Sequence, residues 1–310
     1  MRHATLRQLR IFESVARLGS YSRAAVEVHI TQPAVSAQMR QLEALVGLPL
    51  IEQVGKTLEL TAAGREVLQY SRRMLQEQHD AEKAVAAIRG VEAGELSIAV
   101  VSTAKYFAPR VLMEFWRAYP GLQLKLNIQN RDLTLRTIAA NEVDLAIMGR
   151  PPEKTATVAE KFAPHPHVII APADHPLAAR RQIELEDIAN EPFLVREPGS
   201  GTRLLTDKLF RRHGLKLEPR MEIASNETIK QAVIAGMGLS LLSAHTLGLE
   251  GRIGRLVALN VKGLPLVRSW HVIHRKGKRL TPAAAALREM LLSRGAKLIE
   301  AALADTGSHD

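Results

Sequence analysis

The chain has 310 residues, a formal net charge of +10 and no cysteine. Its length predicts two or three compact units, and 46% hydrophobic residues with 4% aromatics supply aliphatic cores and argue against wholesale disorder. The lack of cysteine excludes disulfides, thiol nucleophiles and thiolate metal sites. The positive charge favours a polyanionic partner, although it would also fit a protein of the membrane surface.

No stretch of the sequence approaches the roughly 20 uninterrupted apolar residues that cross a bilayer, since Gly236 and Gly238 interrupt even residues 232–242. The first residues carry Arg2, Arg7 and Arg10 without an apolar run after them, which does not fit a secretory signal. We therefore expect a cytoplasmic protein with no membrane partner.

Residues 4–61 have the pattern of a small helical module. Leu6, Leu9, Phe12 and Ala16 recur at helical spacing, and Gly19 ends that helix. Ser22 is the expected cap of a second helix. Thr31 is the expected cap of a third, with Pro33 in its first turn and an inner stripe of Val35, Met39, Leu42 and Leu45.

Two helices joined by a short turn, at about residues 21–40, are typical of a helix-turn-helix, whose second helix enters the major groove of DNA. Gln32 can read an adenine edge, Ser36 can donate or accept, and Pro33 or Ala37 can contact a thymine methyl group. The complete set of expected DNA contacts is Arg23, Thr31, Gln32, Pro33, Ser36, Ala37, Arg40 and Lys56. Of these, Arg23, Arg40 and Lys56 suit phosphates. Spacing alone leaves open an ordinary three-helix bundle with a solvated polar face.

Residues 48–60 predict two short extended arms about a turn at Val54, Gly55 and Lys56, which is the pattern of a wing. Residues 62–89 then predict one long helix of roughly 40 Å. It places Val67, Met74, Ala81 and Ile88 seven apart, as in a helix that pairs with a second copy. A solvated connector helix is the alternative.

Five runs make the first 64 residues resemble the DNA-binding domain of LysR-type transcriptional regulators. They are residues 9–12 (LRIF), 20–25 (SYSRAA), 31–36 (TQPAVS), 42–43 (LE) and 60–64 (LTAAG). Ile51 and Gln53 depart from the family, which usually has Phe and often Arg there. The resemblance makes the plain bundle a remote second choice, and it implies that the long helix pairs two subunits.

Residues 92–304 alternate short aliphatic runs with helical stretches. Strands are expected at residues 96–101, 122–128 and 143–147, and helices at residues 107–118 and near 132–140. This alternation predicts an α/β domain with a largely parallel sheet, in which ligands bind beyond the carboxyl ends of the strands.

The turns that follow these strands, and two later turns at residues 196–203 and 225–228 that lead into helices, are rich in groups that bind anions. The expected effector contacts are Ser102, Thr103, Lys105, Gln129, Asn130, Arg131, Arg150, Glu197, Ser200, Thr202, Arg203, Asn226 and Thr228. Hydroxyl groups, free helix-start amides and basic side chains suit a carboxylate or phosphate. For any single turn, simple helix capping explains the residues as well, and only their joint placement favours a site.

The family resemblance implies a periplasmic-binding-protein-like effector domain of two lobes, with the ligand between them. Lobe I would comprise about residues 92–163 and 267–304, including a closing helix at 282–304, and lobe II about residues 164–266. The whole chain would thus be an α/β protein with an N-terminal winged helix-turn-helix and a long linker helix.

Residues 102–107, 197–203, 224–230 and 52–56 further resemble the subgroup that controls Calvin-cycle (RuBisCO) operons. This resemblance implies an effector-dependent activator that binds promoter DNA as a homodimer or homotetramer and acts on RNA polymerase. It implies no cofactor but a small anionic effector, such as ribulose bisphosphate, phosphoenolpyruvate or NADPH. A LysR-type regulator of another operon with a different anionic effector stays open, and a solute-binding protein is a remote alternative.

Three further features are expected to carry no function. Residues 236–238 (GMG) follow a helix and lack the third glycine of a dinucleotide site, so they should turn into a strand. His165 and His167, each preceded by a proline, are expected to be solvated loop residues rather than metal ligands. The basic run at residues 275–279 is expected to be a solvated turn. No nucleophile elbow or zinc-protease motif supports an enzyme, so no catalytic residue is expected.

Overall fold

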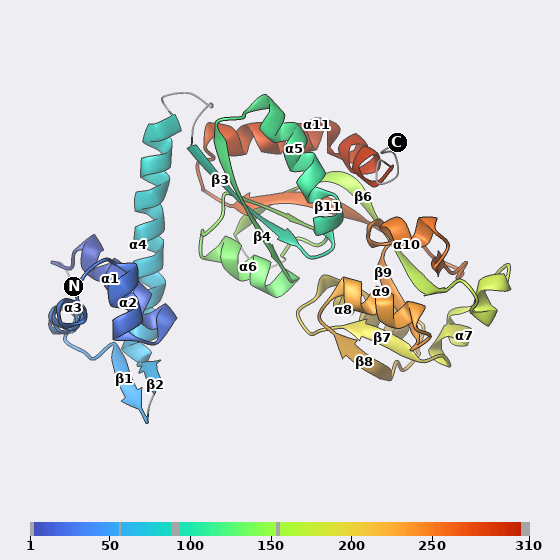
Figure 1. Ribbon diagram of the computed structural model, residues 1–310, viewed down its shortest axis with the longest axis horizontal. Coiled ribbons are helices and arrows are strands. Elements are labelled where there is room, and N and C mark those ends of the chain that lie inside the picture. Colours follow the sequence, from blue (N-terminus) through green and yellow to red (C-terminus); the bar gives the residue numbers. More distant parts are fainter. Residues whose placement is uncertain (1–2, 56, 88–93, 153–155, 305–310) are drawn as a thin grey trace. The chain divides into compact units, whose positions relative to one another are not determined.

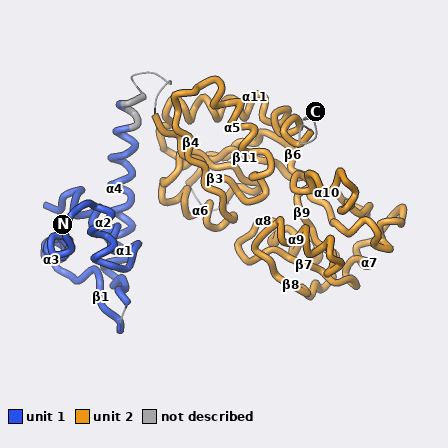
Figure 2. The backbone as a smooth tube through the Cα atoms, viewed as in Figure 1, with its two compact units in different colours: residues 1–88 blue, residues 89–310 orange. Residues whose placement is uncertain are grey.

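The computed structural model describes residues 3–55, 57–87, 94–152 and 156–304. The chain divides into two compact units, residues 1–88 and 89–310 (Figure 2).

The N-terminal unit consists of three short helices, a two-stranded wing and a long helix (Figure 1). In chain order the elements are α1 (Leu6–Leu18), α2 (Tyr21–Glu27), α3 (Gln32–Val46), β1 (Ile51–Val54), β2 (Thr57–Leu60) and α4 (Ala62–Ala87). Helix α1 begins in a capping box between Thr5 and Gln8 and ends at Gly19, whose φ is +60°. Strands β1 and β2 are antiparallel, as the wing pattern predicts.

The expected cap of α2 was wrong by two residues. Ser20, in extended backbone, accepts a hydrogen bond at its Oγ from the amide of Arg23, whereas Ser22 lies inside the helix. Both serines suit a cap. Because α1 already ends at Gly19, α2 begins directly after Ser20, and Ser22 falls within the helix. Thr31 caps α3 as expected, accepting from the amide of Ala34.

The core of this unit forms from the inner faces of α1, α2 and α3, with the first turns of α4. Phe12, Val35 and Leu42 are fully buried in it. Gly64 allows α4 to cross the chain before β1, since a Cβ at Gly64 would lie 1.9 Å from the carbonyl oxygen of Leu50. Only glycine fits this contact without a backbone shift.

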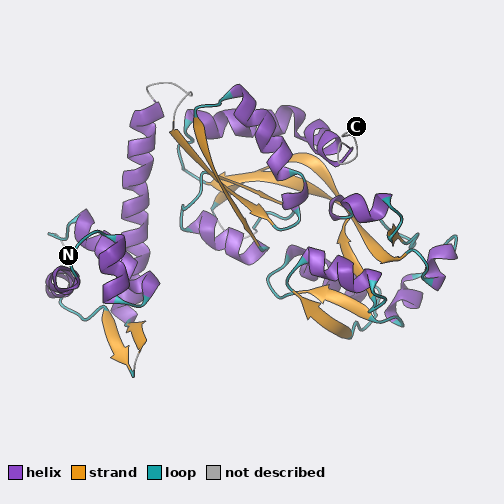
Figure 3. Cartoon of the chain, viewed as in Figure 1, coloured by secondary structure: helices purple, strands orange, loops and turns teal. Residues whose placement is uncertain are grey.

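The C-terminal unit contains two lobes built on one continuous sheet (Figure 3). The strands of the first lobe are β3 (Gly94–Val101), β4 (Leu122–Gln129), β5 (Leu145–Met148) and β11 (Leu266–Arg275). Its helices are η1 (Ala104–Tyr106), α5 (Ala108–Ala118), α6 (Arg131–Ala139) and α11 (Pro282–Ala304). Strands β3, β4 and β5 are parallel, with β3 in the middle. Figure 1 shows α5 and α11 along one face of these strands and α6 along the other.

The second lobe continues the sheet through the long strand β6 (Thr157–Pro172). Its other strands are β7 (Phe193–Arg196), β8 (Pro219–Ile223), β9 (Leu239–Ser243) and β10 (Leu256–Ala258). Its helices are η2 (Pro176–Ala179), α7 (Leu185–Ala189), α8 (Gly201–Arg212), α9 (Asn226–Ile234), η3 (Ala244–Thr246) and α10 (Gly248–Arg252). Residues 236–238 lead into β9, as expected. Strand β6 pairs with β11 up to His167 and with β9 from His167 onward, so it joins the two lobes.

The basic run at residues 275–279 is not a wholly solvated turn. The side chain of Lys278 is 4% exposed, and its Nζ lies 3.1 Å from Oδ1 of the buried Asp144. The Asp144 carboxylate also accepts a hydrogen bond from the amide of Ser97 at 2.9 Å. A buried carboxylate needs a counter-charge, and the turn after β11 supplies it.

Candidate functional site

The outer face of α3 presents the side chains that the sequence assigns to base reading. Gln32, Pro33 and Arg40 are exposed, and Ser36 and Ala37 are half-buried. The amide of Gln32 donates a hydrogen bond from Nε2 to Oγ of Ser36 at 2.9 Å. One Nε2 hydrogen and the carbonyl oxygen of Gln32 are still available, which is what a bidentate contact to adenine requires. The contact with Ser36 therefore orients Gln32 without consuming its recognition groups.

The remaining contacts expected of this unit differ in placement. Thr31 is exposed at the start of α3, where its side chain acts as the helix cap. Arg23 is exposed, but its guanidinium donates to the carbonyl oxygen of Leu18, so it also fixes α2 to the end of α1. Lys56 lies outside the described residues. Beside it, Gln53 donates to the carbonyl oxygen of Gly55 at 3.1 Å, which gives this side chain a role within the wing turn.

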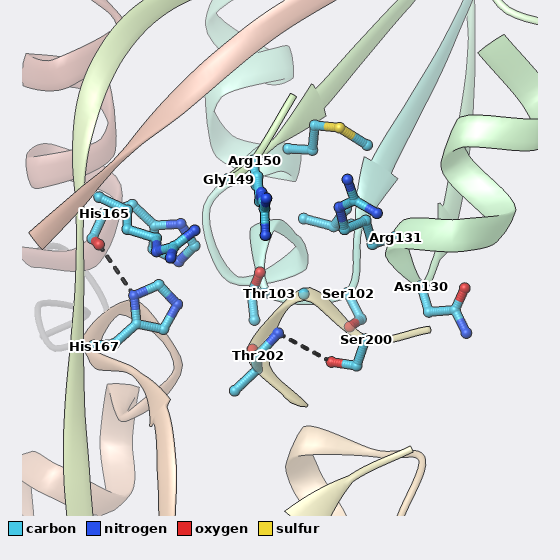
Figure 4. Close-up of a pocket in the computed structure, with 14 residues that line it drawn as sticks. Ser102, Thr103, Asn130, Arg131, Gly149, Arg150, His165, His167, Ser200 and Thr202 are labelled. Carbon is cyan, nitrogen blue, oxygen red and sulfur yellow. Dashed lines mark hydrogen bonds between the residues drawn. The ribbon is translucent and has the colours of Figure 1, made fainter. Parts of the chain in front are cut away.

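A pocket lies in the C-terminal unit at the carboxyl ends of the parallel strands (Figure 4). The space free of protein atoms measures about 460 Å³, counted out to its open mouth. The first lobe lines it with the turns after β3, β4 and β5, and the second lobe with the start of α8, while β6 and β11 contribute from both. The lining residues are Val101, Ser102, Thr103, Asn130, Arg131, Met148, Gly149, Arg150, His165, His167, Ser200, Gly201, Thr202 and Arg268.

Seven of the thirteen expected effector contacts line this pocket, namely Ser102, Thr103, Asn130, Arg131, Arg150, Ser200 and Thr202. Ser200 caps α8 by accepting a hydrogen bond from the amide of Thr202 at 3.2 Å, so the start of that helix faces the pocket. Helix-start amides and arginines together favour a bound anion. Among the described residues that line the pocket there is no carboxylate.

The other six expected contacts lie outside the pocket lining. Arg203 is engaged by two carboxylates, Asp207 at 3.0 Å and Glu222 at 2.9 Å. Gln129 donates to Thr137 at 2.8 Å, and the amide of Thr228 donates to the cap Ser225 at 3.3 Å. The side chains of Arg203 and Gln129 and the backbone amide of Thr228 thus make contacts within their own lobes, which sequence position could not reveal.

Lys105, Glu197 and Asn226, in contrast, belong to polar contacts between the lobes. Nζ of Lys105 lies 3.7 Å from the carboxylate of Glu227. Glu227 also lies 3.0 Å from the buried Lys230, whose Nζ sits over the ring of Tyr106 at 5.0 Å. Burial, followed by the neighbouring carboxylates, raises the pKa of Tyr106, which therefore stays a neutral phenol.

Arg196 is the centre of the second interlobe contact, and the sequence did not single it out for this role. Its side chain is 2% exposed, with Nε 2.8 Å from Oε2 of Glu197. It also donates to Oδ1 of Asn226 and, at 3.2 Å, to Oγ of Ser102 in the first lobe. The only sequence signal was its place at the end of a strand, before the Gly199 turn. The guanidinium links three segments that are far apart in the chain.

His165, His167 and Arg268 are pocket residues that the sequence pattern missed, and the expectation of solvated loop histidines was wrong. Both histidines are 3% exposed and lie on β6. The prolines before them suggested a loop. Up to His167, however, β6 pairs with β11 alone, so prolines whose nitrogens face the unpaired edge cost no ladder hydrogen bond. The sequence did contain one signal for a pocket wall, because two histidines at alternate positions of an extended segment share one face of a strand.

Burial controls the charge of these histidines. It lowers the pKa of His165 well below 6.5 and that of His167 to about 4, with nearby basic groups acting in the same direction. Burial also lowers the pKa of His245, in η3, to about 4. The three imidazoles are therefore neutral near pH 7 when the pocket holds no anion.

Comparison with known proteins agrees with this division of the chain. Residues 6–65 match the bacterial regulatory helix-turn-helix protein family, lysR type, and residues 89–296 match the LysR substrate binding domain. The chain belongs to the LysR family. It is an α/β transcriptional regulator, and its similar relatives are transcriptional regulators rather than enzymes.

Two relatives are similar over nearly the whole chain. The regulator CbbR of Rhodospirillum rubrum is 53% identical over 93% of this chain and 96% of its own length. The RuBisCO operon transcriptional regulator of Allochromatium vinosum is 48% identical over 96% of this chain and 98% of its own length.

Two solved structures are similar in fold. The CcmR regulatory domain of Synechocystis PCC6803, in complex with 2-PG, is 41% identical with a TM-score of 0.63, covering 64% of this chain and 96% of that one. Full-length CbnR complexed with target DNA has a TM-score of 0.69 at 23% identity, covering 94% of this chain and 100% of that one, and shows likeness of fold alone.

Within the described ranges, no helix is long and apolar enough to cross a membrane. The same part of the chain holds no group of three histidine or carboxylate side chains that could bind a metal ion.

Proposed function

We propose that this LysR-family protein regulates a carbon-fixation (RuBisCO) operon in the cytoplasm and senses a small phosphorylated acid. The identity to RuBisCO operon regulators over almost the entire chain supports the target. The pocket supports the ligand class, because it combines three arginines with the start of α8 and has no carboxylate among its described lining residues.

Among phosphorylated metabolites, the relative in complex with 2-PG favours 2-phosphoglycolate or the similar phosphoenolpyruvate as the effector. Each carries one phosphate and one carboxylate. Arg131 and Arg150 come from the first lobe, and the amides of α8 from the second, so such a molecule can bridge the lobes. Ribulose bisphosphate and NADPH are the larger candidates in the same class.

The proposed mechanism couples this pocket to the DNA contacts through assembly. Gln32, Pro33, Ser36 and Ala37 read bases, Arg23, Arg40 and Lys56 hold phosphates, and α4 pairs two chains. Effector binding changes the equilibrium between two arrangements of the lobes, and so the spacing of the DNA-binding modules in a dimer or a dimer of dimers. This changes the access of RNA polymerase and activates the operon.

The test is a DNase footprint on the promoter region of the RuBisCO genes, with and without 2-phosphoglycolate, phosphoenolpyruvate, ribulose bisphosphate and NADPH. We expect at least one of them to change the footprint and to raise the melting temperature. Thr103→Val should abolish both effects, because it removes a pocket hydroxyl, whereas Thr137→Val, outside the pocket, should preserve them. Two results contradict the proposal. One is a footprint on unrelated DNA as strong as the footprint on the promoter region; the other is a footprint and a melting temperature that none of the four effectors changes.

A further inference from the structure

The two buried histidines of the pocket lie where the sheet passes from one lobe to the other. His167 is opposite Leu266 of β11 on one edge of β6 and opposite Ser243 of β9 on the other. Residues 165 and 167 point to the same face of the strand, and their ring centroids are 4.2 Å apart. Figure 4 shows both rings beside Gly149, Arg150 and Thr103. The two histidines therefore line the pocket at the point where the sheet connects the two lobes.

The ring of His165 is confined from two sides. It stacks on Trp270 with centroids 3.7 Å apart and planes 13° from parallel. On another side it meets Gly149, where a Cβ would lie 2.6 Å from Nδ1 of His165. Glycine at position 149 thus lets the imidazole approach the floor of the pocket.

Neither nitrogen of the His165 ring has a hydrogen-bond partner among the described residues, although the side chain is buried. Buried polar atoms without partners are rare in native proteins, because each one costs about 1–3 kcal/mol. His167 differs, since its Nδ1 lies 3.2 Å from the carbonyl oxygen of His165. An unpartnered imidazole in a pocket wall points to a ligand that supplies the missing partner.

The groups around His165 are basic or neutral on every element packed against it. They are His167 on β6, His245 in η3, Arg268 and His271 on β11, and Arg150 after β5, with Arg131 of α6 elsewhere in the pocket wall. Burial and the charge of Arg150 even lower the pKa of Arg268. A further positive charge is therefore unfavourable while the pocket holds no anion.

We propose that the effector pocket binds its anion together with a proton, which the His165–His167 pair takes up from solvent as the anion enters. This deepens the proposed function and rests on it. A neutral imidazole offers one donor and one acceptor, whereas an imidazolium offers two donors, which is what a phosphate or carboxylate requires. The bound anion also reverses the sign of the local field, so protonation of the pair becomes favourable in the complex.

The sign of the pH dependence follows from linkage. The pKa of His167 in the free protein is about 4, and that of His165 is also far below neutral. Anion binding raises the pKa of the pair. Between the free and bound values the free protein is neutral and the complex protonated, so affinity falls about tenfold per pH unit as pH rises. Above the bound value the dependence ends.

The experiment is isothermal titration of the full chain with 2-phosphoglycolate at about pH 7, in buffers of different ionisation enthalpy. A binding heat that changes with buffer gives the number of protons taken up, and we expect a value that approaches one. Affinity measured between about pH 5.5 and 8 should fall as pH rises, as linkage requires. Buffer-independent heat with wild-type protein overturns the proposal while leaving the proposed effector intact.

Variants assign the proton to the histidines. His165→Phe keeps a ring on Trp270, and His167→Gln keeps a donor; the double variant should lose proton uptake and the pH slope. His213→Gln is the control, an exposed histidine at the end of α8 and outside the pocket lining, and should retain both. Undiminished proton uptake in the double variant would place the proton on the phosphate, whose own pKa is about 6, and overturn the proposal. Failure of wild-type protein to bind 2-phosphoglycolate at any pH overturns the proposed effector and this inference with it.

Discussion

Arg196 binds Glu197 and Asn226 of its own lobe and donates to Ser102 of the first lobe, and its replacement by methionine gives the sharpest test of this buried cluster. The substitution keeps much of the aliphatic stem but removes every guanidinium hydrogen bond. Asn226, which is 1% exposed and whose Nδ2 already lacks a partner, would also lose the donor to its Oδ1. Glu197 would lose the group that holds its two oxygens at 2.8 and 3.0 Å.

The expected cost follows from these two orphaned groups. A buried acceptor without a partner costs about 1–3 kcal/mol, and breaking a fully buried ion pair costs about 3–5 kcal/mol. The side chain of Glu197 is 16% exposed and has Nδ2 of Asn130 at 3.5 Å, so water and Asn130 recover part of its loss. We therefore expect Arg196→Met to lower the free energy of unfolding by about 3 kcal/mol.

Denaturant unfolding followed by tryptophan fluorescence measures this quantity in the full chain. The sequence has two tryptophans, Trp116 on α5 and Trp270 on β11, so the signal reports on the C-terminal unit alone. Arg211→Met, at an exposed position in the last turn of α8, is the control and should cost less than about 0.5 kcal/mol. A loss below about 1 kcal/mol for Arg196→Met, or one equal to the control, refutes the assigned role of Arg196.

Three further predictions concern the N-terminal unit. Gly64→Ala should lower the free energy of unfolding of this unit by more than about 2 kcal/mol, because the added Cβ meets the carbonyl oxygen of Leu50. Its melting temperature, followed by circular dichroism, and its DNA binding should both fall, whereas Ala63→Ser should show no such loss. Gln32→Ala should cost about 1–3 kcal/mol of discrimination at one base pair in a binding-site selection, and Ser36→Ala less; unchanged preference in both removes the proposed base reading. Met74→Glu should dissociate the proposed dimer in light scattering, since Met74 is 43% exposed on α4, whereas Arg65→Glu, near the start of that helix, should not; a dimer that persists in Met74→Glu excludes this seam.

The sequence by itself determined the elements whose signals are local. The stop at Gly19, the cap at Thr31 and the wing arms follow from glycine, capping residues and apolar spacing within a few positions of each other. The helix at residues 282–304 was expected from the family resemblance. Parallel strands end at one edge of a sheet, so five pocket residues were also predictable from their place after strands, and Ser200 and Thr202 from their place at the start of a helix. The specific motifs around Gln32 and Gly64 indicated the family.

Only the tertiary structure decided which of the polar turn residues face the pocket and which are engaged elsewhere. Arg203 looks like Arg131 in sequence, yet two carboxylates from residues 4 and 19 positions away hold it. Arg196 meets Ser102 across 94 positions, and Lys278 meets Asp144 across a similarly large separation. His165 and His167 lie where β6 changes its partner from β11 to β9, and this position at the connection of the two lobes puts them in the pocket wall. Such contacts depend on strand order and burial, which bring distant residues together and leave no periodic trace in the chain.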